Sequence, residues 1–547
     1  MHAHYADLWH RVALAVPERP AIVTVDGRSL DYREFDDAAA RLAALLRDHG
    51  VAAGDKIAIV MHNRPEWLIT FYAALKLGAA PVALNFRYKA SELSVLFADS
   101  DAVAVVYPAS LADVIAEAVE ALDPRPLLLQ VDDVDRATLL PGALEFEDYL
   151  AVEPLPHENA PDGELFIYTG GTTGTPKGVV WGVRDMLSMQ LFNAYTTVGL
   201  QPAETDDEVV RIAVDPATRR IALLPLAPFM HGTALTSTMN AFLLGGTVVI
   251  TPWPRFDPER AYRVMADHRV TRLIVAGDAI AIPLLDALDD LGVTELPRLE
   301  SIVSSGMRFS DSTKERLHRL GNITIGDILA STEGGALAIA FTTSVDDLPS
   351  RLRLTPGAVV LDDDLREVQG TPGARGRIAF TGGMPKGYYK DPEKTAATFL
   401  EFNGKRHVIP GDLVVVQENG HVELLGRGSS VVNSGGEKVY PSEVEESLLR
   451  FPGVHDAVVY GIPDARWGEV VAAAVAVDDP SSVSEGDLID HVGAELAGYK
   501  KPRRILVLTD LQRSPSGKID LVKLRERTAQ HGATARPQAT AQRESTA

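Results

Sequence analysis

Short apolar runs rich in valine and isoleucine alternate with longer amphipathic segments along most of the chain. Residues 56–60 (Lys-Ile-Ala-Ile-Val) and residues 103–107 (Val-Ala-Val-Val-Tyr) are runs of the first kind, whereas residues 32–49 repeat apolar side chains at helical spacing. Gly50 and Gly78 each follow an expected helix, at the position where glycine commonly ends one. The alternation predicts an α/β fold with mainly parallel sheets.

The chain of 547 residues is too long for one hydrophobic core, and its length indicates about two to four domains. Around residues 426–430 the composition changes to a small, flexible junction of Gly, Arg and Ser. We therefore expect a large N-terminal domain over residues 1–428 and a compact, mobile α+β domain over residues 429–527. Residues 528–547 have no periodicity, which predicts a disordered tail.

The charge and the absence of cysteine exclude several classes of function. The sequence has 75 Asp and Glu residues against 53 Lys and Arg residues, a formal net charge of −22. This excess disfavours nucleic acid and anionic membrane surfaces as partners. Without cysteine the chain has no disulfide, no thiolate metal site and no cysteine nucleophile, and a reducing cytoplasm suits it.

Two segments bear on membranes. Residues 1–7 lack a basic segment followed by an apolar core, so we expect no signal peptide. Residues 221–254 have no formal charge apart from a proton on His231, but prolines and glycines interrupt them, and a spanning helix needs about 20 predominantly apolar residues. We expect a buried strand, loop, helix and strand there, no integral membrane segment, and a cytoplasmic protein.

A loop rich in glycine and threonine follows the apolar run at residues 165–167. Residues 168–178 are Tyr-Thr-Gly-Gly-Thr-Thr-Gly-Thr-Pro-Lys-Gly. Glycines let backbone N–H groups turn toward an anion, threonine hydroxyls add donors, and Lys177 adds a positive charge. Gly178 follows Lys177 where a P-loop would have Ser or Thr. A short glycine-rich string alone would indicate only a flexible turn, but the whole string predicts a triphosphate-binding loop.

This loop resembles the signature loop of the adenylate-forming enzymes, the superfamily of acyl-CoA synthetases, peptide-synthetase adenylation domains and firefly luciferase. Further blocks similar to those of the superfamily follow in the expected order, at residues 305–307, 329–333, 410–412, 435–441 and 514–518. The resemblance spans roughly residues 5–525, and such an ordered series is not expected by chance. It implies an N-terminal region of two α/β subdomains with a distorted β-barrel, and a small mobile C-terminal domain.

The resemblance also implies a nucleotide site. Thr332 and Glu333 hold phosphate and magnesium in the superfamily, and Asp412, assisted by Arg427, accepts hydrogen bonds from the ribose. Leu329-Ala330 departs from the aromatic residue and glycine that are usual before this block. The candidates for binding ATP and coenzyme A are Thr169, Gly170, Gly171, Thr172, Thr173, Gly174, Lys177, Ser305, Gly306, Met307, Leu329, Ala330, Ser331, Asp412, Arg427, Gly435, Gly436, Glu437 and Lys438.

Activation of a carboxylate by ATP brings two anions together, so the site must neutralise charge before attack. The resemblance assigns Mg²⁺ to Glu333, the leaving phosphates to Lys177 and the bridge between carboxylate and α-phosphate to Lys518. Oxygen ligands favour Mg²⁺ over Zn²⁺, and we expect no structural metal. In the superfamily the small domain then rotates about a hinge, here Ser429, and presents the loop at residues 435–438 to the pantetheine channel. The catalytic candidates are Lys518, Glu333, Thr332 and His231.

Residues 228–234 stand where the superfamily lines its acyl pocket, with His231 at the gate. No Asp occurs between residues 221 and 254 to pair with a substrate ammonium, which favours an uncharged organic tail. His231 alone would equally suit a buried structural histidine. Residues 276–279 and 435–438 look most like those of bacterial ligases for long-chain and steroid side-chain acids, with benzoate-like and medium-chain acids as alternatives.

We therefore predict an acyl-CoA ligase whose partners are a small carboxylic acid, ATP and CoA. A homodimer is one candidate assembly. The alternatives are a ligase that loads a carrier protein, a luciferase-like oxygenase, and a catalytically silent nucleotide or lipid binder.

Overall fold

The computed structural model describes residues 4–133, 138–169, 176–196, 200–215, 221–427, 431–434, 437–464, 468–496, 498–513 and 519–534. Its contacts divide the chain into two compact units. The first consists of Met1–Ala358 and Ala379–Pro410, and the second of Val359–Ile378 and Gly411–Ala547. The predicted domain boundary at residue 428 stays a prediction, because residues 428–430 lie outside the described part.

The first unit contains two sheets. One has the strand order β19-β9-β8-β4-β3-β5-β6-β7, in which β8, β4, β3, β5, β6 and β7 are parallel and β9 and β19 are antiparallel to their neighbours. The strand bounds are β3 Lys56–Ile59, β4 Ala80–Ala83, β5 Ala102–Pro108, β6 Leu127–Val131, β7 Leu144–Glu145, β8 Glu164–Thr169, β9 Lys177–Gly182 and β19 Gly387–Tyr388.

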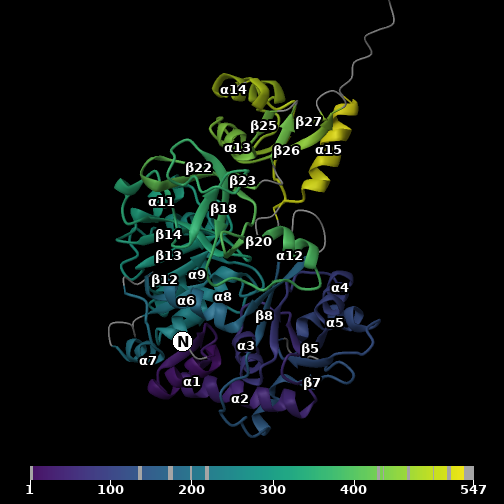
Figure 1. Cartoon of the computed structure of the whole chain (residues 1–547), viewed down its shortest axis with the longest axis vertical. Helices are drawn as coiled ribbons and strands as arrows, with labels where there is room; N and C mark the ends of the chain where they lie inside the picture. The colour runs from purple at the N-terminus through teal and green to yellow at the C-terminus, as the bar shows by residue number, and fades with distance from the viewer. Residues whose placement is uncertain are drawn as a thin grey trace, which may run out of the picture. The chain divides into compact units, whose positions relative to one another are not determined.

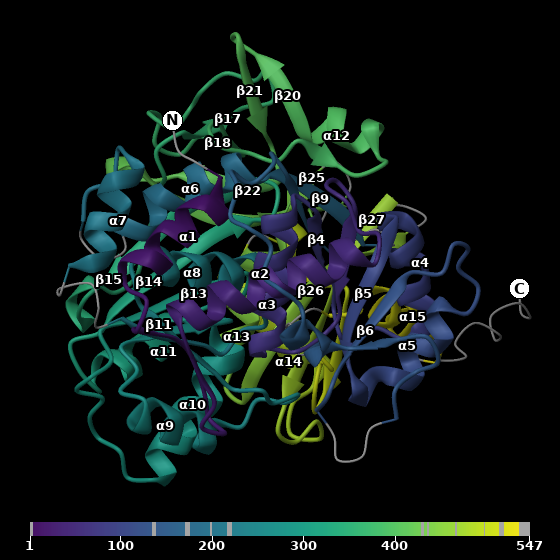
Figure 2. The ribbon, with the colours of Figure 1, turned by 90° about the horizontal axis from the view of Figure 1, so that it is seen from below.

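The other sheet of this unit has the order β2-β1-β11-β10-β12-β13-β14-β15-β16 and is parallel from β1 to β14. The bounds are β1 Pro20–Thr24, β2 Ser29–Asp31, β10 Ala222–Pro225, β11 Thr247–Ile250, β12 Arg272–Val275, β13 Ser301–Ser305, β14 Thr324–Ser331, β15 Gly335–Thr342 and β16 Leu352–Leu354. A hairpin, β20 Phe399–Phe402 with β21 Lys405–Val408, lies beside α12, and its Val408 pairs with Phe380 (Figures 1 and 2).

Helices connect the strands of both sheets. Their bounds are α1 Tyr5–Ala15, α2 Tyr32–Asp48, α3 Pro65–Leu77, α4 Ala90–Ser100, α5 Ala112–Val119, α6 Val183–Thr196, α7 Asp206–Val214, α8 Gly232–Leu243, α9 Pro258–Asp267, α10 Asp278–Asp290, α11 Asp311–His318 and α12 Pro392–Thr398. Helix α2 begins with a capping box, in which Asp31 accepts from the N–H of Glu34 (2.7 Å) and Glu34 accepts from the N–H of Asp31 (2.9 Å). Helix α3 ends at Gly78, whose φ of 74° lies in the left-handed region.

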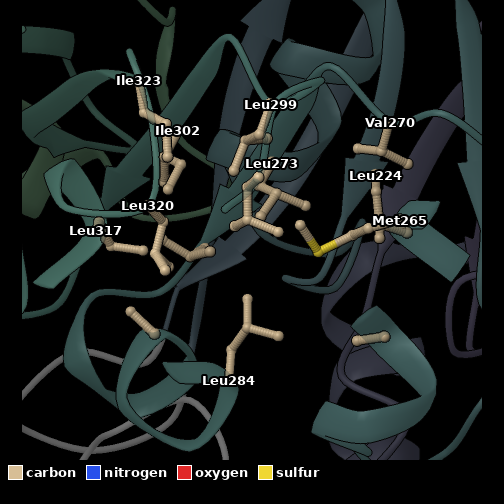
Figure 3. Packing of buried hydrophobic residues seen from close by; sticks show 14 of the residues in the cluster. Leu224, Met265, Val270, Leu273, Leu284, Leu299, Ile302, Leu317, Leu320 and Ile323 are labelled. Atoms are coloured by element: carbon tan, nitrogen blue, oxygen red, sulfur yellow. The ribbon is translucent and has the colours of Figure 1, made fainter. Parts of the chain in front are cut away.

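Apolar side chains from β10, β12, β13 and β14 pack against α9, α10 and α11. Figure 3 shows this cluster, in which Leu273 and Ile302 of the sheet face Leu284 of α10. Full burial of a Leu or Ile side chain contributes roughly 1.5–3 kcal/mol relative to exposure, so the cluster fixes the strand ends from which the loops of the site emerge.

The second unit contains a group of antiparallel strands and a small α+β region. The first group comprises β17 Ala358–Leu361, β18 Arg375–Phe380, β22 Asp412–Val416 and β23 His421–Arg427. The second comprises β24 Val432–Ser434, β25 Glu437–Val439, β26 Val454–Asp464, β27 Gly468–Val477, β28 Arg504–Leu508, α13 Pro441–Leu449, α14 Glu485–Glu495 and α15 Leu521–Thr534. Helix α15 continues past residue 528, where the sequence predicts the tail to begin.

The predicted α/β class is confirmed, and residues 221–254 form the expected strand, loop, helix and strand as β10, α8 and β11. The distorted barrel was expected as part of the architecture, but the described strands form open sheets and no closed barrel. Within the described part of the chain, no helix combines the length and hydropathy needed to cross a bilayer.

Candidate functional site

The glycine- and threonine-rich loop connects two adjacent antiparallel strands. Thr169 is the last residue of β8 and Lys177 the first of β9, and the two are directly paired across the ladder. Gly170, Gly171, Thr172, Thr173 and Gly174 lie between them, outside the described residues. The ladder therefore fixes both ends of the predicted triphosphate loop at neighbouring positions.

Lys177 lies close to the start of α12. Its Nζ is 3.4 Å from Oδ2 of Asp391, which caps this helix by accepting from the N–H of Lys394 at 2.9 Å. The hydrogen bond from Lys394 lowers the pKa of the Asp391 carboxyl, and Lys177 adds to this effect. The Lys177 side chain is 37% exposed, so an incoming phosphate can compete with Asp391 for it.

Thr332 and Glu333 lie in the tight turn between β14 and β15. The Nε1–H of Trp181 donates to the carbonyl oxygen of Thr332 at 2.9 Å, and the hydroxyl of Tyr388 donates to Oε1 of Glu333 at 2.7 Å. Both aromatic residues belong to the sheet that carries the loop, because Trp181 is on β9 and Tyr388 is on β19. Two side chains thus tie the turn to this sheet.

Strand β9 explains why these groups meet. Side chains two residues apart in a strand share a face, so Lys177, Val179 and Trp181 point to the same side of β9. Tyr388 is paired directly with Val179 and therefore shares that face. The structure brings Lys177, Thr332 and Glu333 to one side of this sheet, whereas sequence reasoning missed Trp181 and Tyr388. The period-two spacing from Lys177 to Trp181 was the available signal.

The predicted adenine turn begins at the carboxyl end of β13. Ser305 is the last residue of this strand and is paired with Ile328 of the parallel strand β14, and Gly306 has a φ of 81°. Leu329, Ala330 and Ser331 complete β14, where the register shifts between Leu329 and Ala330. Met307 follows the turn. Carboxyl ends of adjacent parallel strands form one edge, which is where α/β sheets bind ligands.

The loop after β12 supports this turn. The N–H of Gly277 donates to Oγ of Ser304 at 2.9 Å, and the N–H of Asp278 donates to the carbonyl of Arg308 at 2.9 Å. Oδ1 of Asp278 accepts from the N–H of Ser310 at 3.1 Å. A Cβ at Gly277 would lie 2.0 Å from the Arg308 carbonyl oxygen, so only glycine permits this contact.

His231 follows β10 at the same edge. It is the N-cap residue of α8, has extended backbone and is half-buried. The neighbouring Phe229 and Met230 are buried. The structure therefore places His231 at the end of a loop with an apolar interior.

In the second unit, Asp412 and Arg427 are directly opposite each other on β22 and β23. Asp412 is buried, and for Arg427 only the backbone is described. Glu437 and Lys438 lie on β25, paired with Ser434 and Asn433 of β24. Gly435 and Gly436 join these strands, and Lys518 lies between β28 and α15. These three residues fall outside the described part.

The family model of the AMP-binding enzymes matches residues 9–389, and that of the AMP-binding enzyme C-terminal domain matches residues 443–518. The chain belongs to the AMP-binding enzyme family. The predicted membership of the adenylate-forming enzymes is thereby confirmed.

This AMP-binding enzyme has similar relatives over nearly its whole length. A medium/long-chain-fatty-acid–CoA/3-oxocholest-4-en-26-oate–CoA ligase of Mycolicibacterium smegmatis is 39% identical over 532 residues, 95% of each chain. A 3-oxocholest-4-en-26-oate–CoA ligase of Rhodococcus rhodochrous is 36% identical, again over 95% of each chain. The predictions of an enzyme and of an acyl-CoA ligase are confirmed.

Solved structures agree with the fold. A fatty acyl-CoA synthetase of Mycobacterium tuberculosis superposes with a TM-score of 0.71 at 26% identity, covering 97% of this chain and 99% of the other. ATP-bound MatB of Rhodopseudomonas palustris gives a TM-score of 0.78 at 25% identity, covering 95% and 98%.

Proposed function

We propose that this AMP-binding enzyme joins a medium- or long-chain fatty acid, or a steroid side-chain acid, to coenzyme A. The products are acyl-CoA, AMP and diphosphate. The observation that carries the proposal is the similarity to ligases named for these acids, which are 36% and 39% identical to this chain over 95% of its length. The uncharged segment between residues 221 and 254, with buried Phe229 and Met230, supports an apolar substrate tail.

In the first half-reaction a carboxylate oxygen attacks the α-phosphorus of ATP, and diphosphate leaves. We assign the phosphates to the loop ending at Lys177 and to Thr332, because Lys177 shares one face of β9 with Trp181, whose indole N–H donates to the Thr332 carbonyl. Positive charge and fixed donors at this place lower the repulsion between the two anions.

Glu333 suits a magnesium ion. Mg²⁺ in nucleotide sites commonly uses one or two carboxylates together with phosphates and water. One oriented carboxylate is therefore a sufficient protein ligand for Mg²⁺. The Tyr388 hydroxyl fixes the direction of the Glu333 carboxylate. Among the residues that the structure describes, no cluster of three or more His, Asp or Glu side chains offers another metal site. Bound Mg²⁺ would supply charge neutralisation on the phosphates.

In the second half-reaction the sulfur of CoA, having lost its proton, attacks the acyl carbonyl, and AMP leaves. We assign Asp412 and Arg427 to the ribose, since they are cross-strand neighbours. Lys518 is proposed to bridge carboxylate and α-phosphate in the first step, and Gly435, Gly436, Glu437 and Lys438 to line the thiol path. We also propose a homodimer and a cytoplasmic location. Transfer to a carrier protein and a silent binding role are not favoured, because the relatives are named CoA ligases.

A screen of carboxylic acids tests the function. AMP release is measured with ATP, Mg²⁺ and CoA across acids from short aliphatic to steroid side-chain acids. We expect CoA-dependent release and a thioester product with the long or steroid acids. Turnover restricted to short acids would refute the substrate class, and loading of a carrier protein without any CoA thioester would refute the reaction.

A further inference from the structure

Asn63 makes three hydrogen bonds to the backbone of the loop that leads to His231. Its Nδ2 donates to the carbonyl oxygens of Pro225 at 3.2 Å and Ala227 at 3.0 Å, and its Oδ1 accepts from the N–H of Phe229 at 2.7 Å. Asn63 is buried, with 8% of the residue exposed. One buried amide thus satisfies three backbone groups of a loop more than 160 residues away in the sequence.

The opposite side of this loop is held by the sheet. The N–H groups of Leu226 and Ala227 donate to the carbonyl oxygen of Ile274 on β12, at 3.0 and 3.3 Å. The loop backbone is therefore fixed between β12 and Asn63, and removal of the Asn63 amide frees one side only.

Ion pairs and a hydrogen bond hold the turn that carries Asn63. Both oxygens of the buried Glu66 carboxylate are occupied, Oε1 by Arg28 at 2.8 Å and Oε2 by Arg64 at 3.1 Å. Arg64 also donates to the carbonyl of Asp132 at 3.3 Å. These contacts fix the turn between β3 and α3, in which Asn63 lies, independently of the loop that it holds.

An aromatic contact from the same helix adds to the support. The rings of Trp67 on α3 and Phe229 in the loop have centroids 5.4 Å apart, at 50° between their planes. Both side chains are buried. The first turn of α3 thereby fixes the side chain of Phe229 as well as its backbone.

We propose that Asn63 is a positioning residue for the acid, one that sets the wall of the acyl pocket by fixing the backbone from Pro225 to Phe229. The inference rests on the proposed function, because it takes residues 228–234 as pocket wall. The geometry assigns Asn63 to the acid and not to ATP, since its bonds reach the loop after β10 and not the loops after β13 and β14.

The test is Asn63→Ala in the full chain, assayed with palmitate and hexanoate. We expect KM for palmitate to rise about 10-fold or more and KM for ATP to stay within about twofold. The preference for palmitate over hexanoate, as the ratio of kcat/KM values, should fall. Asn63→Asp should not restore it, because a carboxylate keeps the acceptor for Phe229 but faces two carbonyl oxygens.

Two further variants keep the test decisive. Thr70 is also buried on α3, but its hydroxyl donates only to the Glu66 carbonyl at 2.7 Å, so Thr70→Val should lower stability without moving the KM for palmitate. If Asn63→Ala does not fold, Trp67→Phe, which loosens Phe229 without removing a loop hydrogen bond, should raise the same KM.

An equal rise of the KM values for palmitate and for ATP would overturn the inference. An unchanged preference for palmitate over hexanoate in both Asn63→Ala and Trp67→Phe would overturn it as well. The proposed function fails separately, since in that case the wild-type enzyme forms a CoA thioester from none of the acids in the screen.

Discussion

Tyr388 fixes the direction of the carboxylate expected to bind magnesium. Its hydroxyl donates to Oε1 of Glu333 at 2.7 Å, and a hydrogen bond to a charged group is worth about 1.5–3 kcal/mol. We expect Tyr388→Phe to raise the Mg²⁺ concentration that half-saturates acid-dependent diphosphate exchange into ATP by about 10-fold.

The neighbouring residue provides a matched control. Tyr389 donates to Oδ2 of Asp101, also at 2.7 Å, so Tyr389→Phe loses a bond of the same kind away from Glu333. The Mg²⁺ requirement of Tyr389→Phe should stay at the wild-type value. Equal shifts in both variants would show that Tyr388 acts through stability alone.

Motifs predicted some residues of the site, but they did not predict the contacts between them. Lys177, Thr332 and Glu333 could be predicted because each stands in a motif with a fixed order. The period-two spacing from Lys177 could have placed Trp181 on the same face of its strand. The bonds from Trp181 to Thr332 and from Tyr388 to Glu333 could not be predicted, because they join residues 151 and 55 positions apart. The placement of Lys518 and of the loop at residues 170–174 stays a prediction.

In the loop after β12, the backbone lies very close to the backbone that follows the predicted adenine turn. Gly277 has a φ of 50°, and a Cβ there would overlap the Arg308 carbonyl. We expect Gly277→Ala to lower the free energy of unfolding by about 2 kcal/mol or more and to raise the KM for ATP, since the loop from Met307 to Ser310 must move. Urea unfolding and initial rates measure the two effects.

Gly292 gives the corresponding control. Its φ is 68°, but nothing lies within 4 Å of a Cβ built on it. Gly292→Ala should therefore show only the cost of the left-handed backbone, about 1–2 kcal/mol, with the KM for ATP unchanged. A raised KM in both variants would contradict the role given to the loop.

Elements with a clear period were predicted well from sequence. The strands at residues 56–60 and 103–107, the helix from residue 32, and the order of elements from residue 221 to 254 follow from local patterns. Sheet closure does not have a local pattern, because it depends on which edges meet, and the expected barrel is not found among the described strands.

At the scale of the whole molecule, two half-reactions are expected to depend on different residues. Lys518→Ala should abolish acid-dependent diphosphate exchange by removing the bridging charge, yet spare thioester formation from supplied acyl-adenylate. Exchange of labelled diphosphate and thioester formation are measured on the same preparation. Equal loss of both activities would contradict the expectation that the small domain rotates between the two half-reactions.

Two buried histidines should make the stability of the protein depend on pH. Burial lowers the pKa of His4 and of His62 to about 4 in the folded protein, against 6.5 unfolded. The stability that these two histidines contribute in the neutral form is fully present above pH 6.5 and is lost as the pH falls toward 4. For each histidine, the free energy of unfolding should fall by about 1.4 kcal/mol as the pH is lowered from about 7.5 to about 5.5.

His4 permits a direct test. Its Nδ1 accepts from the N–H of Ala6 at 3.2 Å as the cap of α1, and asparagine can cap the helix without titrating. His4→Asn should reduce the change in unfolding free energy between about pH 7.5 and pH 5.5, measured by urea unfolding, by about 1.4 kcal/mol. An unchanged pH dependence in His4→Asn would refute the assignment.

The direct pairing of Thr169 with Lys177 has a consequence for evolution. A residue gained or lost between them would change the length of the predicted triphosphate loop, but it would leave Lys177 in step with Trp181 further along β9. An insertion within β9 would instead turn every following side chain to the other face. Chain length should therefore be constrained twice, in the loop by the phosphates that we assign to it and in β9 by the face that Lys177 shares with Trp181.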